Sequence, residues 1–384
     1  MAHEGTDCGE GEGEAFPWHL GLFDAHCHPT DLMTTMEKVP SMRSKGLTVM
    51  ATRRQDQHLV ASFVDELQRL QTWPDSKIII PAFGWHPWFS HQIIDDQDCQ
   101  VNECPNKMDH YKQVIIPAPE DTDFLDSLPE PLLLSEILHE VRSKLLRYPD
   151  ALIGEVGLDK AFRIPAAQVL DQSSEVDPQL TPGSREGRRL SKYRVRPVHQ
   201  QRILTEQLQL AGELKRPVSV HGVAAHGLLY ETISRTWLSH QNVVRSKRAR
   251  KNWAKCAEGG NVPKSGPDSS KESGPKSYPP RICLHSYSGH SDTMKQYLHP
   301  SVPAKIFFSF SSLVNFSSES PKAVEVIQAV PPDRLLAESD LHAAGEEMDE
   351  LMEDVVKRIC QIKGWTWAFG VQQLADNWRS FIYG

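Results

Sequence analysis

The chain has 384 residues, of which 39% are hydrophobic and 24% charged, and its net charge is −8. These values are ordinary for a globular protein and give no overall attraction to nucleic acid. Any polyanion binding must therefore come from a local positive field or from bound metal ions. No apolar run approaches the ~20 residues that a membrane-spanning helix needs, so we expect no membrane contact.

The N-terminal segment "MAHEGTDCGEGEGEAF" is acidic and rich in glycine. It has neither the basic nor the apolar region of a secretory signal. We expect residues 1–20 to form a disordered tail and residues 21–384 to form one domain. The seven cysteines are scattered and form no CxxC pair, which favours a reducing compartment and predicts a cytoplasmic protein.

Eight short apolar runs follow the tail, and each is bounded by turn residues or charges, as is typical of buried strands. In chain order they are "GLFDAH", "LTVMAT", "KIIIPAFGWH", "ALIGEVGL", "PVSVHG", "RICLHS", "KIFFSFS" and "RLLAES". Between most of them lie amphipathic stretches of helical period, at residues 55–71, 132–147, 198–215, 224–238 and 321–330. Eight strands that alternate with helices predict a (β/α)8 TIM barrel of the α/β class. A doubly wound open sheet is the alternative that the pattern leaves open.

Such a barrel takes about 250 residues, so we interpret the surplus as three long insertions. They cover about residues 91–131, 163–197 and 240–280. The third contains the basic run "RSKRARK" and then a low-complexity segment that predicts a disordered loop. The basic run is most simply a solvated loop; a nuclear import signal or a contact to a polyanion are the other interpretations.

Side chains that commonly bind metals stand at the ends of the predicted strands. The first strand ends in "FDAHCHPTD", where His26 and His28 share one face and Cys27 points away from it. Five further strands end in or carry His86, Glu155, His221, His285 and Asp340. In a barrel these ends converge on one mouth, where active sites lie. Because buried polar groups are costly unless paired, so many at separate ends favour a metal site over isolated packing residues.

Four imidazoles and two carboxylates are more than one tetrahedral ion needs, and they suit zinc, manganese, iron or magnesium. Two ions about 3.5–4 Å apart that share a carboxylate would use the whole set. Such a pair lowers the pKa of a bound water to about 7 and stabilises both oxygens of an in-line displacement. The predicted chemistry is hydrolysis of a phosphoester, or of an acyl or amide bond.

The motifs "FDAHCHPTD", "FGWHP", "IGEVGLD", "SVHG", "LHSYSG" and "LLAESD" resemble, in that order, the successive motifs of the TatD-related deoxyribonuclease family. The C-terminal "NWRSF" is similar to the family's closing Asn-x-x-Arg-x-Phe pattern, with the Arg one place early. The resemblance implies an amidohydrolase-type barrel with two divalent ions, Mg²⁺, Mn²⁺ or Zn²⁺. It also implies hydrolysis of DNA phosphodiesters, in some members of the family from the 3′ end, with RNA as a further substrate to test.

The resemblance implies six ion ligands, which are His26, His28, Glu155, His221, His285 and Asp340. Glu155 would bridge the two ions, and Asp340 would also orient the attacking water or take its proton. The two histidines of the first strand would share one ion with Asp340. The histidines of the fifth and sixth strands would hold the second ion.

Further residues gain roles from the same resemblance. His86 would contact the substrate, and Asp159 and Glu338 would fix the orientation of the imidazoles, as carboxylates behind metal ligands do. The family has an arginine, a plausible phosphate clamp, where this chain has Val223. His226 or the basic run of the third insertion would then supply the substrate contact.

Two other functions remain open. The first is a metal-dependent hydrolase that acts on a small ester, amide or aminoacyl substrate. The second is a binding protein that keeps the metal site but contacts protein partners through its insertions. The fold does not decide among these functions, and phosphate positioning usually depends on arginine and lysine.

Overall fold

The computed structural model describes residues 15–69, 77–97, 104–167, 180–181, 183, 188–242, 276–317 and 321–384. Its main strands are β1 (Phe23–Cys27), β2 (Gly46–Ala51), β3 (Ile78–Phe83), β7 (Ile153–Asp159), β9 (Val218–Val223), β10 (Arg281–Leu284), β11 (Lys305–Phe310) and β12 (Leu335–Ala337). They form two parallel sheets, β1-β2-β3 and β12-β11-β10-β9-β7. Each of these eight strands coincides with one of the eight apolar runs predicted to be strands.

The two sheets meet at both edges and close a barrel. Between β3 and β7, the Phe83 N–H donates to the Leu152 carbonyl at 3.0 Å. Between the end of β12 and β1, the Asp340 N–H donates to the His26 carbonyl at 3.0 Å. The predicted (β/α)8 barrel is therefore confirmed, and the open doubly wound sheet is wrong because the first and last strands are joined.

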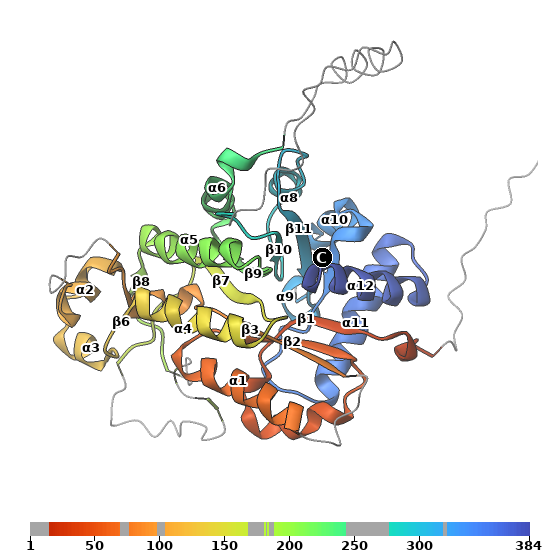
Figure 1. Ribbon diagram of the computed structural model, residues 1–384, viewed down its shortest axis with the longest axis horizontal. Coiled ribbons are helices and arrows are strands. Elements are labelled where there is room, and N and C mark those ends of the chain that lie inside the picture. The colour runs from red at the N-terminus through yellow and green to blue at the C-terminus, as the bar shows by residue number, and fades with distance from the viewer. Residues whose placement is uncertain are drawn as a thin grey trace, which may run out of the picture.

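Helices surround the barrel, as Figure 1 shows. They are α1 (Arg54–Arg69), α4 (Leu134–Arg147), α5 (Pro197–Glu213), α6 (His226–Thr236), α8 (Ser291–Tyr297), α9 (Ser312–Asn315), α10 (Lys322–Ala329), α11 (Glu346–Lys363) and α12 (Trp367–Ile382). The predicted helical stretches correspond to α1, α4, α5, α6 and α10, with ends displaced by a few residues. Most of the barrel's core lies between these helices and the strands.

The interior of the barrel is apolar where the strands begin. Phe23, Ile80 and Phe307 pack there against Trp378 and other side chains of α12 in one buried cluster. Arg281, the first residue of β10, donates to the carbonyl of Phe381 at 2.7 Å. Helix α12 therefore covers the barrel at the starts of its strands.

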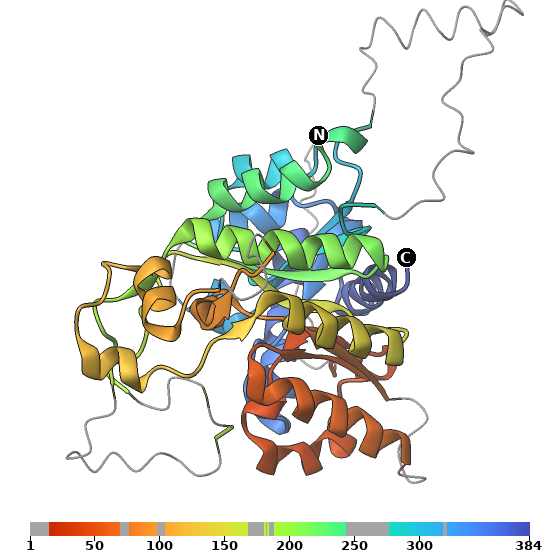
Figure 2. The ribbon, with the colours of Figure 1, turned by 60° about the vertical axis from the view of Figure 1, so that its left-hand side comes forward.

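The first two insertions fold together on the opposite side, where the strands end. They form β4 (Ile93–Ile94), α2 (Lys107–Val114), β5 (Ile115–Ile116), α3 (Thr122–Ser127) and β8 (Arg194–Val195), and β6 (Leu132–Leu133) directly follows the first insertion. Strand β5 of the first insertion pairs antiparallel with β8 of the second. Tyr111 and Phe124 share a small buried core with Ile164 and Tyr193. Helices α2 and α3 project to one side of the barrel in Figure 1 and Figure 2.

The third insertion begins and returns on the side where the strands begin. Its first described residues follow the 3-10 helix Leu238–His240, and its last described residues precede β10. The Ser277 hydroxyl donates to the carbonyl of Thr236 at 2.6 Å. The run "RSKRARK" and the segment predicted to be disordered lie outside the described residues. The described residues that flank this segment, 241–242 and 276–280, lie at the end of the barrel remote from the mouth.

The predicted N-terminal tail differs from the structure over its last residues. Residues 1–14 lie outside the described part. The side chains of Phe16, Trp18 and Leu20 pack on the barrel's core, so the prediction of disorder is wrong for this stretch. The Trp18 indole N–H also donates to Glu353 of α11 at 3.1 Å. Phe16 and Trp18 bury aromatic surface against the barrel. The acidic, glycine-rich residues before them dominate the composition of the segment and led to the prediction of disorder.

Candidate metal centre

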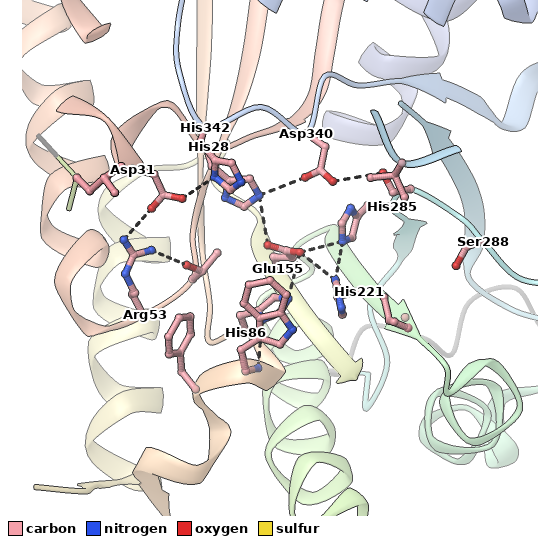
Figure 3. A pocket seen from close by; sticks show the side chains of 18 residues that line it. His28, Asp31, Arg53, His86, Glu155, His221, His285, Ser288, Asp340 and His342 are labelled. Atoms are coloured by element: carbon pink, nitrogen blue, oxygen red, sulfur yellow. Dashed lines mark hydrogen bonds and ion pairs between the residues drawn. The ribbon is translucent and has the colours of Figure 1, made fainter. Parts of the chain in front are cut away.

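The carboxylate of Glu155 lies at the centre of the barrel mouth, and each of its oxygens faces a different group of side chains (Figure 3). The Oε2 atom lies 3.3 Å from His28 Nε2 and 3.6 Å from His26 Nε2. The Nε2 atoms of these two imidazoles are 3.1 Å apart. Asp340 Oδ1 lies 3.5 Å from His28 Nε2. His26 and His28 thus face one carboxylate oxygen of Glu155, and Asp340 lies beside these two imidazoles.

The Oε1 atom of Glu155 faces three other imidazoles. It lies 2.9 Å from His285 Nε2, 3.1 Å from His221 Nδ1 and 3.2 Å from His86 Nε2. His221 Nδ1 and His285 Nε2 are 3.1 Å apart. The structure therefore brings together all six side chains that the sequence analysis offered as ion ligands, and adds His86 to the second group.

Local backbone structure turns these side chains inward. The pairing of β1 with β2 shifts register between Asp24 and Cys27, as at a bulge. Cys27 is buried in the core between strands and helices, and its thiol lies away from the mouth, 3.5 Å from the carbonyl of Thr48. In β7, a Cβ on Gly157 would lie 2.0 Å from the carbonyl oxygen of His221. A glycine at this point lets the strands of Glu155 and His221 approach closely.

Carboxylates stand behind two of the imidazoles. Asp159 Oδ2 lies 3.3 Å from His221 Nε2 and accepts the indole N–H of Trp88 at 2.6 Å. Glu338 is fully buried, and its Oε1 lies 3.7 Å from His285 Nδ1. Behind His26, the Nδ1 atom lies 2.8 Å from the hydroxyl of Ser219, a contact that no motif predicts. Each of these imidazoles presents its other nitrogen to the mouth.

His86 is held differently. Its Nδ1 accepts the backbone N–H of Trp88 at 3.1 Å, so the proton of the neutral ring is on Nε2, which faces Glu155. Burial lowers the pKa of His86 to about 4, so the ring is neutral at pH 7. Its geometry thus fits a hydrogen-bond donor that fixes the Glu155 carboxylate.

Comparison with known proteins explains why these motifs occur in this order. The family model described as "TatD related DNase" matches residues 23–383. The chain belongs to this family. It is 35% identical over 363 residues to the Cut9-interacting protein scn1 of Schizosaccharomyces pombe, covering 94% of this chain and 98% of the relative. It is also 28% identical to the uncharacterized deoxyribonuclease YMR262W of Saccharomyces cerevisiae. That match extends over 266 residues and covers 68% of this chain and 66% of the relative.

Solved structures support the fold. YjjV, a TatD homologue of Escherichia coli K12, gives a TM-score of 0.52 at 16% identity and covers 94% of this chain and 98% of its own. A TatD-family hydrolase of Entamoeba histolytica gives 0.51 at 11% identity, with 94% of this chain and 98% of that chain covered. Family membership and the ligand cluster identify the chain as a hydrolase of ester bonds with a metal-dependent site.

The donor set of this TatD-family protein fits divalent cations. In each of the groups His26–His28–Glu155 and His86–Glu155–His221, the possible ligand atoms lie within 4.8 Å of one another. The same holds for His26, His285 and Glu338. Imidazole nitrogens mixed with carboxylate oxygens are typical of zinc, manganese and iron sites rather than thiolate-type sites.

The charges of the cluster compensate one another. Burial alone would raise the pKa of Glu155, but the histidines around it, His86 and His285 foremost, lower it well below its usual value. Burial alone would lower the pKa of His28, but Glu155 and Asp340 raise it to about 9. The pKa of His285 is also raised against the effect of burial, mainly by Glu155. A cation that binds here must displace protons from these rings.

The mouth opens into a cavity of about 510 Å³, whose charged wall the sequence analysis missed. The Arg53 guanidinium lies on this wall and binds Asp31 Oδ1 at 2.7 Å and Asp56 Oδ2 at 3.0 Å. Asp31 Oδ2 in turn lies 2.7 Å from His342 Nδ1. Arg53 stands two residues after β2, so inspection of every strand end for charged residues would have found it.

Apolar side chains also line the cavity, among them Trp88, Leu180, Val223 and Val314. Val223 lines the cavity at the position where the family has an arginine. His226, predicted to contact the substrate, is not among the residues that line the cavity. Its Nε2 lies 3.3 Å from the hydroxyl of Ser288, which does line the cavity. Burial lowers the pKa of His226 to about 4. The contact predicted for His226 stays a prediction; in this structure its ring contacts Ser288 at the edge of the cavity.

Proposed function

We propose that this protein is a two-metal phosphodiesterase that hydrolyses DNA and removes nucleotides from the 3′ end. One observation carries the proposal: the two oxygens of Glu155 face two separate groups of imidazoles. A carboxylate with two oxygens can bridge two ions, whereas an imidazole with one free lone pair cannot. Two bound ions would activate a water and stabilise the attacking and leaving oxygens of an in-line displacement.

The roles of the ligands follow from their places around Glu155. His26, His28 and Asp340 would hold one ion, and His221 and His285 the other. The hydrogen bond from His86 would keep Glu155 Oε1 turned toward the second group.

Asp340 suits the role of the group that orients the water or takes its proton. Its backbone φ is +55°, a left-handed conformation that is uncommon for residues other than glycine and frequent at functional sites. Burial alone would raise the pKa of Asp340, but the hydrogen bond with His28 lowers it to about 2. The carboxylate is therefore ionised at neutral pH and ready to accept a hydrogen bond from water.

The experiment that tests the proposal is digestion of single-stranded DNA labelled at either end, with Mg²⁺, Mn²⁺ or Zn²⁺ added and a chelator as the control. We expect mononucleotides from the 3′ end, and no cleavage after chelation. An RNA of the same sequence tests the second nucleic acid. Metal-independent cleavage, or none with any of these ions, would contradict the proposal.

The volume of the cavity favours one alternative. About 510 Å³ falls within the ~300–1,000 Å³ typical of small-molecule sites, which also suits a small ester, amide or aminoacyl substrate. Turnover of small p-nitrophenyl esters or aminoacyl esters at higher kcat/KM than any oligonucleotide would favour this alternative over the DNase.

Protein partners form a second alternative, which the name of scn1, a Cut9-interacting protein, suggests. The packed layer of the first two insertions offers a surface for such a partner. A deletion of α2 and α3 that abolishes partner binding but leaves hydrolysis intact would separate the two functions.

We infer a cytoplasmic location, with the nucleus as the alternative if the basic run is an import signal. Cys27, Cys283 and Cys360 are buried free thiols, as is usual in reducing compartments. Within the described residues, none of the helices has the length and apolar character needed to cross a membrane.

A further inference from the structure

Trp88 is the largest apolar side chain in the cavity wall, and it is 37% exposed. A large exposed aromatic ring in a concave site marks a place where a ligand is held. Leu180, Val223 and Val314 also line the cavity, so its apolar lining is not limited to a single ring.

The indole of Trp88 is fixed before any ligand arrives. It stacks on Phe162, with ring centroids 4.7 Å apart and an angle of 11° between the planes. Its N–H donates to Asp159 Oδ2 at 2.6 Å. A ring held in this way loses little conformational entropy when it binds a second planar group.

The cavity offers little cationic charge to a nucleic acid. Arg53 is the one lysine or arginine among the described residues that line it, and it is paired with Asp31 and Asp56. Phosphate contacts by arginine and lysine usually supply much of the affinity for DNA. In this cavity, affinity must come from the metal ions and from contacts to the bases.

Trp88 is also close to the reacting centre. Its ring centroid lies 4.8 Å from that of His86 and 6.3 Å from that of His221. A planar group on the indole would therefore lie within one nucleotide of the Glu155 carboxylate.

We propose that Trp88 is a substrate-binding residue of the site and stacks on the base next to the scissile phosphodiester. The inference rests on the proposed DNase function. Stacking accepts every base because each has a π-face, which suits a nuclease without sequence preference. It would replace the phosphate clamp that Val223 cannot provide.

The test compares two single-stranded oligonucleotides, one with a normal 3′-terminal base and one whose terminal residue is an abasic tetrahydrofuran. We expect wild-type protein to prefer the normal end in kcat/KM and in binding affinity by about 5- to 150-fold, the range of base stacking on aromatic side chains. Trp88→Ala should remove the preference by weakening only the normal end. Trp88→Phe should keep most of it, although the N–H to Asp159 is lost. Phe369→Ala, which removes an aromatic ring that is 50% exposed on α12, is the control without effect.

Equal treatment of both ends by wild-type protein would overturn the stacking role, as would an equal loss on both ends in Trp88→Ala. The latter result would show that Trp88 acts only by positioning His221 through Asp159. Binding affinities, measured by fluorescence anisotropy, separate this failure from that of the proposed function. If no oligonucleotide is hydrolysed but binding still prefers the normal end in wild type and not in Trp88→Ala, the DNase proposal fails and the stacking site stands.

Discussion

The two ends of the barrel interior are built from opposite kinds of residue. Where the strands begin, Phe23, Phe307 and Trp378 fill the interior and α12 closes it. Where the strands end, ionisable side chains around Glu155 fill the same interior and a cavity opens above them. Apolar packing at one end therefore supports a cluster of buried charges at the other end that would be unfavourable by itself.

The cluster at the mouth is costly in two ways. Buried charges need partners, and Glu155 obtains them only from surrounding imidazoles. Backbone strain is also concentrated there, with a φ of +55° at Asp340 and +39° at Ser286. Variants at the mouth should therefore change metal binding and activity with little loss of stability. Variants at the other end should lower stability with little change in metal binding or activity.

The largest effect is expected from Glu155→Gln. The amide keeps the size but removes the charge between two cations, so we expect kcat/KM for DNA to fall by about 10³-fold or more, or ~4 kcal/mol of transition-state stabilisation. Initial rates and a urea unfolding curve should be measured together, with Glu213→Gln as the control. Glu213 is an exposed carboxylate of α5 that pairs with Arg142 at 2.6 Å. Parent-level activity in Glu155→Gln would mean that the bridging role is wrong.

Trp378→Ala should give the largest loss of stability. Removing this buried indole leaves a cavity at the closed end of the barrel, and we expect the free energy of unfolding to fall by about 3–5 kcal/mol. Metal bound per folded molecule should stay unchanged. Urea denaturation with parallel metal analysis measures both; loss of metal without loss of stability would break the separation of the two ends.

His86→Ala should reduce activity by about 10- to 100-fold, as is typical when a side chain that orients a metal ligand is removed. Metal should be retained, because the hydrogen bond from His86 Nε2 positions Glu155 rather than replacing a ligand. Metal content and kcat/KM on the same sample distinguish the outcomes. A variant that loses one ion would identify His86 as a ligand.

Metal affinity should weaken as the pH falls. The pKa of His28 is raised to about 9, so below that pH binding must displace its proton. We expect the association constant to fall by about tenfold for each pH unit between pH 8 and pH 6 for every proton displaced. Calorimetric titration with Mn²⁺ or Zn²⁺ at three pH values measures the association constant. Repeating it in buffers of different ionisation enthalpy measures the number of protons displaced. A constant affinity would show that the imidazoles are already neutral.

The smallest effect is expected from Cys27→Ala. The thiol is buried among apolar side chains away from the mouth, so its removal should cost about 1 kcal/mol of stability. Metal content and activity should remain at the parent level. If this variant loses its metal, the bulge in β1 depends on the cysteine.

Much of this architecture could be predicted because strands and ligands have local signals. Eight apolar runs mark the strands, and His26 with His28 signals a shared face through simple alternation. Helices α11 and α12 were not predicted, although α11 places Met348, Met352, Val355 and Ile359 on one buried face at helical spacing. The closing role of α12 depends on contacts with strand starts far away in the sequence.

Side-chain directions were the harder part. Arg53 gains its place from Asp31 and Asp56, and one of these partners comes from another strand end. His226 lies in the predicted neighbourhood, but as the first residue of α6 it faces Ser288 rather than the cavity. Distances along the chain locate an element; only packing determines which way its side chains point.

Metal stoichiometry shows whether Glu155 bridges two ions. Full-length protein should be stripped with chelator, titrated with Mn²⁺ or Zn²⁺, and analysed by atomic emission beside the DNA hydrolysis assay. We predict two tightly bound ions per chain, hydrolysis that rises only with the second equivalent, and at most one tight ion in Glu155→Gln. One ion per chain at full activity, or two tight ions in Glu155→Gln, would contradict the account.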